Sequence, residues 1–136
     1  MLASAMMETE MMDATTYADG DNKTGDSWNG GVCKQNWGMM RKCHPAWQSL
    51  TANDYASARP MNTNRSLDVT VYNECRAFYG TSWWAGQRNG SSGLANPNTP
   101  DIQRFKLAED WTNTMVACHL TDDIRFWANV PAIILR

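Results

Sequence analysis

A glutamate near the start of the chain is the first candidate for acid–base chemistry. Glu8 follows an apolar stretch and has Met6, Met7 and Met11 as close neighbours. Partial desolvation among methionine side chains raises the pKa of a carboxyl and keeps it protonated near neutral pH, as a general acid requires. Glutamates on solvated helix faces are common, however, and the residues alone favour that simpler interpretation for Glu8 and Glu10.

Three aspartates follow in a polar, glycine-rich loop, residues 19–31. Asp19, Asp21 and Asp26 lie there among asparagine and threonine, in a setting where a carboxylate stays ionised. Two carboxyls in contrasting surroundings form the acid and base pair of a glycosidase. An EF-hand calcium site does not fit the loop, because a lysine occupies its fifth position and a glycine its twelfth.

Tryptophans lie in or beside this loop and a second polar segment, residues 85–100. Sugar rings pack their C–H faces on aromatic rings, while their hydroxyls need hydrogen-bonding partners. Tryptophan next to uncharged polar residues therefore suits a neutral polysaccharide. Tryptophan is also a frequent core residue, and Trp111 and Trp127 are expected in the core.

The composition limits the possible partners. The chain has 136 residues, a net charge of −2 and 19% charged residues, and its pI is about 5.6. These values argue against a nucleic-acid-binding protein, which would be basic. No apolar run is long enough to span a membrane. The length predicts one domain, residues 1–136.

The candidate residues need elements that bring them together. The apolar spacing predicts helices over residues 1–12 and 64–79, and a third that begins at Thr99-Pro100-Asp101. Turns or a short hairpin are expected over 19–31, a short helix or extended segment over 32–43, and an irregular loop over 85–100. Thr121 is expected to start a short last helix before an apolar tail. The predicted class is α+β and mainly α.

Four cysteines, at positions 33, 43, 75 and 118, match no zinc or redox spacing. Two disulfides in an oxidising compartment are the preferred interpretation, and the spacing leaves all three connectivities open. The first residues, MLASAMMETE, lack the basic region of a signal peptide. We therefore expect a truncated or processed N-terminus on a secreted protein.

Several motifs together resemble glycoside hydrolase family 134. They are AMMET, GDNKTGD, NWGMMR, CHPAW, WWAGQRNG, LANPNTPDI and HLTDDIRFWANVPAI. They cover most of the chain in the order found in the family, and several are long and unusual. The resemblance implies an endo-β-1,4-mannanase that inverts anomeric configuration, with a lysozyme-like fold, a small β-hairpin region and no cofactor or metal.

The resemblance also assigns roles to individual residues. Glu8 of AMMET corresponds to the general acid, and Asp21 is the best match to the base, with Asp19 and Asp26 left open. It suggests the disulfides Cys43–Cys75 and Cys33–Cys118. Gln87 departs from the usual AGHRNG, which puts one substrate contact in question. From loop position and chemistry, the residues expected to bind substrate are Trp28, Asn36, Trp37, Trp83, Trp84, Arg88 and Asn89.

Two other functions fit parts of this pattern. A lysozyme-like muramidase would share the fold and the acid, but enzymes that act on anionic cell walls tend to be basic. A non-catalytic carbohydrate-binding domain would keep the aromatic residues, but it would not need both Glu8 and the aspartate loop. The expected partner is β-1,4-mannan, and the expected state is a monomer.

Overall fold

The computed structural model describes Met1 and residues 4–5, 8–9 and 13–118. This part of the chain is mainly helical with one short two-stranded sheet, which confirms the predicted α+β, mainly α class. In chain order, the 3-10 helices (η), strands and α-helices are η1 (Ala14–Thr16), η2 (Asp19–Asn22), η3 (Gly25–Ser27), β1 (Asn29–Gly30), β2 (Gln35–Asn36), α2 (Trp37–Cys43), η4 (Pro45–Trp47), η5 (Ala52–Asn62), α3 (Arg65–Tyr79), η6 (Gly80–Ser82), α4 (Trp83–Ala95) and α5 (Pro100–Cys118). The last helix and apolar tail predicted from the sequence lie outside the described residues.

The first described residues form helical turns. Ala5 and Glu8 are helical, and backbone hydrogen bonds of 2.9 Å run from Ala5 N to Met1 O and from Thr9 N to Ala5 O. Each bond joins residues four positions apart, which is the pattern of an α-helix. Among the described residues of the helix predicted over 1–12, Ser4, Ala5 and Glu8 are helical, whereas Met1 and Thr9 are not.

The aspartate-rich loop folds into two 3-10 turns, η2 and η3, followed by the antiparallel pair β1 and β2. Two glycines leave room in this region for a buried indole. A Cβ on Gly20 would lie 1.9 Å from the ring of Trp28, and one on Gly30 would lie 2.3 Å from it. The glycines that predicted turns here therefore also make space for a core tryptophan.

Helix α3 follows the sequence prediction closely. The side chain of Asn64 caps its start by accepting a hydrogen bond of 3.1 Å from Leu67 N. Gly80 ends it with a φ of 53°, where a side chain would be strained. Its buried residues are Asp68, Val71, Tyr72 and Cys75.

The second glycine-rich segment is mostly helical, so the loop predicted over residues 85–100 is wrong for α4. Gly90 lies inside this helix with φ 55° and ψ −136°, a conformation that is almost restricted to glycine. It joins two helical segments at a kink. A Cβ on Gly86 would lie 2.3 Å from the side chain of Met39 in α2. These glycines mark a kink and a close helix contact.

Helix α5 begins at Pro100, as predicted, with Asp101 in its first turn. Ile102, Phe105 and Ala108 of the expected apolar stripe are buried. Trp111 is 41% exposed, so its predicted place in the core is wrong. Trp127 lies outside the described residues.

One disulfide joins α2 to α3. Cys43 and Cys75 are bonded, which confirms that pairing. Cys33 and Cys118 are both free, the first buried and the second exposed, so the suggested Cys33–Cys118 bond is wrong. Cys33 sits in the turn between β1 and β2, while Cys118 ends α5.

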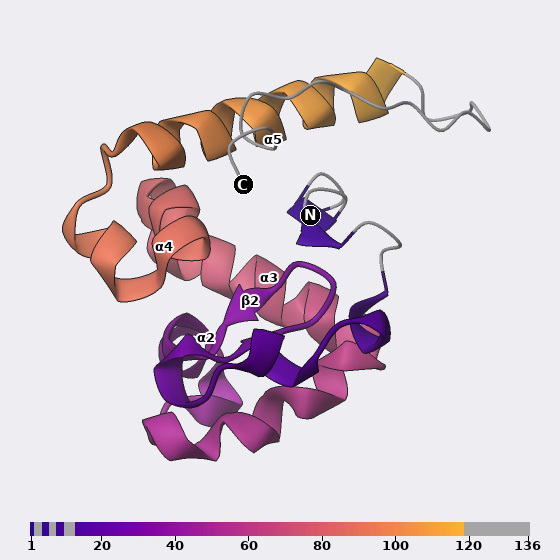
Figure 1. Ribbon diagram of the computed structural model, residues 1–136, viewed down its shortest axis with the longest axis vertical. Coiled ribbons are helices and arrows are strands. Elements are labelled where there is room, and N and C mark those ends of the chain that lie inside the picture. The colour runs from indigo at the N-terminus through magenta and orange to yellow at the C-terminus, as the bar shows by residue number, and fades with distance from the viewer. Residues whose placement is uncertain (2–3, 6–7, 10–12, 119–136) are drawn as a thin grey trace.

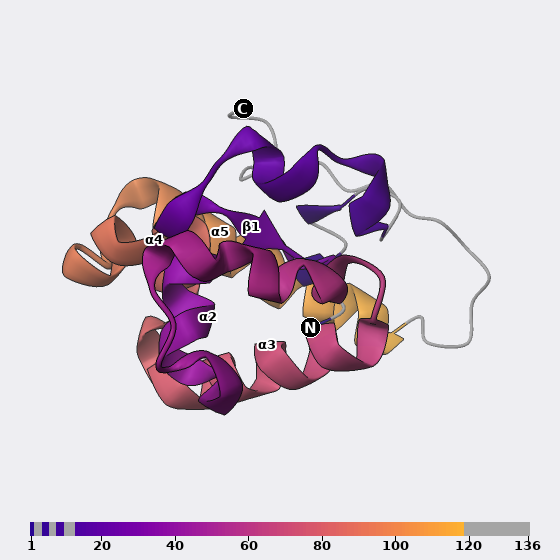
Figure 2. The ribbon, with the colours of Figure 1, turned by 90° about the horizontal axis from the view of Figure 1, so that it is seen from below.

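The helices pack around the hairpin. α2 contacts α3 and α4, and α4 contacts α5. In Figure 1, α5 runs along one edge of the molecule, and the first described residues lie between it and the hairpin. Figure 2 shows α2 and α3 from a second side. Among the described helices, none has the length and apolar character needed to cross a membrane.

Candidate active site

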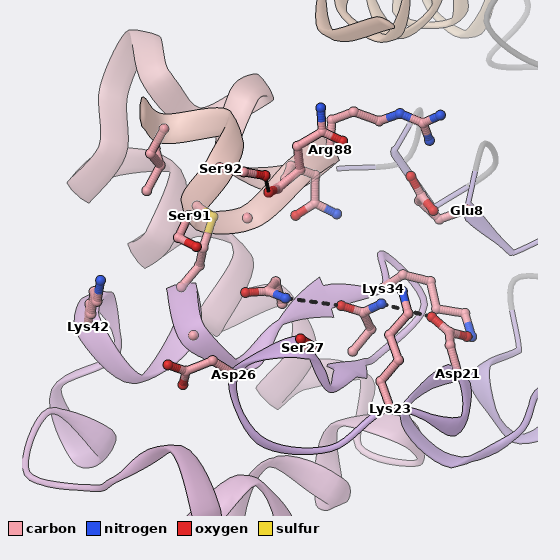
Figure 3. Close-up of a pocket in the computed structure, with 18 residues that line it drawn as sticks. Glu8, Asp21, Lys23, Asp26, Ser27, Lys34, Lys42, Arg88, Ser91 and Ser92 are labelled. Atoms are coloured by element: carbon pink, nitrogen blue, oxygen red, sulfur yellow. Dashed lines mark hydrogen bonds and ion pairs between the residues drawn. The ribbon is translucent and has the colours of Figure 1, made fainter. Parts of the chain in front are cut away.

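A cleft of about 680 Å³ lies where the first helical turns, the hairpin and α4 meet. Figure 3 shows Glu8 and Arg88 on one side of it and Asp21 and Asp26 on the other. Most of its lining is polar. The lining residues are Glu8, Asp21, Lys23, Asp26, Ser27, Asn29, Lys34, Asn36, Gly38, Met39, Lys42, Gln87, Arg88, Asn89, Gly90, Ser91, Ser92 and Leu94.

Glu8 is half-buried at the cleft. The next residue in the chain, Thr9, is fully buried. The methionines expected to desolvate its carboxyl, Met6, Met7 and Met11, lie outside the described residues. The structure therefore supports a position for Glu8 in the cleft, while its protonation state stays a prediction.

Asp21 faces the same cleft from η2. Its carboxylate accepts hydrogen bonds from Lys34 Nζ at 2.5 Å and from Asn29 Nδ2 at 2.9 Å. Burial alone raises the pKa of this carboxyl, but the two hydrogen bonds and the charges of Lys34 and Lys23 outweigh burial and lower it. Asp21 is therefore held ionised, as a general base must be.

The backbone of Asp21 is also unusual. Asp21 and the next residue, Asn22, have φ values of 58° and 60°, in the left-handed region that aspartate and asparagine tolerate better than most residues. This tight turn aims the Asp21 carboxylate at the hairpin. Such strained positions persist where the surrounding contacts over-determine them.

The other two aspartates also form ion pairs, each with an arginine. Asp26 lines the cleft, but Arg41 binds both of its carboxylate oxygens, at 2.6 and 2.8 Å, and this contact lowers the pKa of Asp26. Asp19 is absent from the cleft lining and pairs with Arg59 at 2.9 Å. Two of the three candidates, Asp21 and Asp26, line the cleft, and of these two only Asp26 has both carboxylate oxygens bound by an arginine.

Three of the polar residues predicted to bind substrate do line the cleft. Asn36 and Asn89 come from β2 and α4, and Arg88 precedes Asn89. Asn89 Nδ2 donates to Asp101 at 2.7 Å. Gln87, which replaces an expected histidine, donates from Nε2 to Cys33 O at 2.5 Å. It thereby ties α4 to the hairpin turn.

The tryptophans lie elsewhere. Trp28, Trp37 and Trp83 are 0%, 0% and 1% exposed, so the prediction that they line the cleft is wrong. Their large apolar rings fill the core instead. Trp84 is half-buried and also absent from the lining. The cations of Arg76 and Lys106 lie 5.5 and 5.0 Å from the centre of its ring.

Sequence reasoning missed Lys34, the closest partner of Asp21. Lys34 lies in the hairpin turn with a φ of 49°, and its Nζ also lies 4.1 Å from the ring centre of Tyr17. No local pattern distinguishes it from a solvated surface lysine, because its partner is thirteen positions away. Knowledge of the hairpin was needed to find it.

Over the described residues, no group of three or more histidine, cysteine or acidic side chains could hold a metal ion. No protein with a curated description matches the chain. Residues 1–130 match the sequence profile of glycosyl hydrolase family 134. That match covers nearly the whole chain and includes Glu8, Asp21 and Asp26 of the cleft. The chain therefore belongs to glycosyl hydrolase family 134.

Proposed function

We propose that this glycoside hydrolase is a secreted endo-β-1,4-mannanase that inverts anomeric configuration. Glu8 acts as its general acid and Asp21 as its general base. The observation that carries the proposal is that both carboxyls line one cleft in a chain of family 134. Asp19 is the weakest alternative base because it lies outside the cleft lining.

The chemistry needs two proton transfers. Glu8 gives its proton to the glycosidic oxygen as the bond from that oxygen to the anomeric carbon breaks. A water molecule attacks the anomeric carbon from the opposite face of the sugar, and Asp21 takes a proton from that water. This inverting geometry needs about 6.5–9.5 Å between the carboxyls, so that the water fits between base and sugar.

The environment of Asp21 suits the base. Its lowered pKa keeps the carboxylate ionised, while the hydrogen bonds from Lys34 and Asn29 fix its orientation. A positioned base contributes roughly 10²–10⁴-fold to the rate of such a reaction. Lys34 lowers the basicity of Asp21, but it also fixes the position of the carboxylate.

The cleft wall suits a sugar polymer. Its amides, hydroxyls and Arg88 offer donors and acceptors for sugar hydroxyls. Asn36, Arg88 and Asn89 remain our candidates for these contacts. The Cys43–Cys75 disulfide is consistent with an oxidising compartment, where an extracellular polysaccharide would be met. We propose that the enzyme acts as a monomer.

The test compares the wild-type protein with Glu8→Gln and Asp21→Asn on mannan, chitin and peptidoglycan. We expect manno-oligosaccharides from the wild type, and a loss of at least about 100-fold in kcat for both variants. Glu74→Gln and Asp26→Asn are matched controls, since Glu74 lies outside the cleft and Asp26 is bound by Arg41. Both should keep most of the activity.

The outcomes separate the alternatives. Proton NMR of the first product should show the α-anomer, and an initial β-anomer would exclude inversion. Release of products from peptidoglycan alone would identify a muramidase. A folded wild-type protein that hydrolyses none of the three polymers would leave only a binding function. A loss of activity in Asp26→Asn equal to that in Asp21→Asn would challenge the choice of base.

A further inference from the structure

A buried carboxylate outside the cleft contacts the hairpin that carries part of the site. Asp68 lies on α3, is 0% exposed and is absent from the cleft lining. A fully buried aspartate is unusual unless its oxygens are well paired. The proposed reaction does not use it directly, so its partners must explain its place.

The side-chain oxygens of Asp68 accept hydrogen bonds from the hairpin, one from its turn and one from β2. One carboxylate oxygen accepts from Val32 N at 2.8 Å, and the other accepts from Gln35 Nε2 at 2.8 Å. The same Gln35 nitrogen also lies 3.1 Å from the backbone oxygen of Asp68. A Cβ on Gly31 would lie 2.1 Å from the carboxylate. The turn is thus closed around this one side chain.

The hairpin turn that Asp68 contacts also contains Lys34, the residue that pairs with the proposed base Asp21. Lys34 lies between the two residues that donate to Asp68, Val32 and Gln35. Its left-handed backbone, with φ 49°, belongs to this closed turn. From there its ammonium reaches Asp21 at 2.5 Å. A turn held in place by Asp68 therefore holds the cation that orients the base.

The same turn also contacts the segment of the proposed acid. Thr9, the residue after Glu8, is fully buried, and its hydroxyl lies 3.0 Å from Val32 O and 3.1 Å from Ala5 O. Val32 N thus donates to the Asp68 carboxylate, and Val32 O accepts from the Thr9 hydroxyl. The turn is therefore bound to the backbone on which Glu8 sits.

We propose that Asp68 is a positioning residue that fixes the spacing of Glu8 and Asp21 through the hairpin turn, an inference that rests on the proposed function. Asp68 can satisfy Val32 N and Gln35 Nε2 together because a carboxylate offers only acceptors. An asparagine in its place would point an NH₂ group at one of these donors.

The pKa of Asp68 reflects both its burial and its partners. Burial has the largest effect and the pKa is raised overall, although the hydrogen bonds from Val32 and Gln35 and the charge of Arg65 act in the opposite direction. Asp68 in turn contributes to the raised pKa of the Cys33 thiol, for which burial is the larger cause. These are the groups that face it from the hairpin and from its own helix.

The experiment compares Asp68→Asn with Val71→Ala, one turn along α3 and equally buried. The first measurement is the titration of the Asp21 carboxyl by carbon-13 NMR without substrate. In Asp68→Asn the pKa of Asp21 should rise, because the ammonium of Lys34 is no longer held against it. The second measurement is kcat and KM on mannan, where kcat should fall about 10–100-fold with a smaller change in KM.

The control separates positioning from stability. Val71→Ala removes core volume but leaves the hydrogen bonds from Val32 and Gln35 to Asp68 in place, so both the Asp21 titration and kcat should stay at wild-type values. An unchanged Asp21 titration in folded Asp68→Asn would overturn the inference. If Asp68→Asn does not fold, Gln35→Met serves instead, because it removes the donor to Asp68 and keeps the Asp68 carboxylate. A raised pKa of Asp21 and a lower kcat in Gln35→Met would then support the inference, and an unchanged titration would overturn it. A wild-type protein inactive on mannan would refute the proposed function, and the titration would still test Asp68.

Discussion

At the scale of single residues, the proposed function assigns Asp21 and Glu8 opposite protonation states. Asp21 is surrounded by donors from Lys34 and Asn29, whereas Glu8 sits on a helical turn, half-buried. Hydrogen bonds to a carboxylate stabilise its ionised form, and a less polar setting favours the protonated form. An acid and base pair requires surroundings that differ in this way, so the proposal predicts that the surroundings of Glu8 favour its protonated form.

Replacement of Lys34 should show how far this residue lowers the pKa of Asp21. In Lys34→Met the carboxylate loses its closest cation and hydrogen bond, so the pKa of Asp21 should rise. Because the base acts only when ionised, the acidic limb of the profile of kcat/KM against pH should move to higher pH. Lys23→Met is the control, since Lys23 acts on Asp21 through charge alone, and it should shift the limb less. An acidic limb unmoved in Lys34→Met would indicate a different base.

At the scale of elements, the sequence predicted some boundaries well and others poorly. The start of α5 at Pro100 and the extent of α3 follow from capping residues and apolar spacing, which are local signals. α4 was missed because glycine usually marks loops. Gly86 and Gly90 are used for a helix contact and a kink, and such tertiary uses leave no local trace.

The site shows the same division between local and long-range information. The family motifs assigned roles to Glu8 and Asp21, and loop position and chemistry suggested Asn36, Arg88 and Asn89; all five line the cleft. The tryptophans were misplaced because the type and position of a residue do not reveal whether its side chain faces the core or the cleft. Lys34 was missed because its role depends on a contact made only after the hairpin forms.

The kink in α4 gives a prediction at this scale. Gly90→Ala puts a side chain at φ 55° and ψ −136°, which costs about 1–3 kcal/mol of stability. Urea denaturation should show this loss, with a lower midpoint and an unchanged slope. Ser91→Ala, at the next and exposed position, should change the midpoint little. A Gly90→Ala midpoint equal to that of the wild type would show that α4 can repack without its kink.

At the scale of the whole molecule, one covalent link joins helices far apart in the chain. Cys43 and Cys75 are separated by 32 positions, and their bond ties α2 to α3. A cross-link stabilises the fold mainly by restricting the unfolded chain, and a loop of this size contributes about 3–4 kcal/mol. The cleft depends on this packing because two of its lining residues belong to this region. Asn36 lies just before α2, and Gly38 lies in its first turn.

Removal of that link should lower the stability of the entire fold. The double variant Cys43→Ala with Cys75→Ala is expected to lose about 3–4 kcal/mol of the free energy of unfolding, measured by urea denaturation. Cys118→Ala is the control, because Cys118 is exposed and free. It should leave the free energy of unfolding within about 0.5 kcal/mol of the wild-type value. Equal midpoints for all three proteins would mean that helix packing alone holds α2 on α3.

The burial of the tryptophans has a spectroscopic consequence. Trp28, Trp37, Trp47 and Trp83 are shielded from water, and an indole in apolar surroundings emits at shorter wavelength than one in water. The intrinsic fluorescence of the folded protein should therefore be blue-shifted and should move to the red when the core opens. Because none of these rings lines the cleft, added oligosaccharide should leave the emission nearly constant. Fluorescence then reports on folding, and a ligand titration needs a different signal.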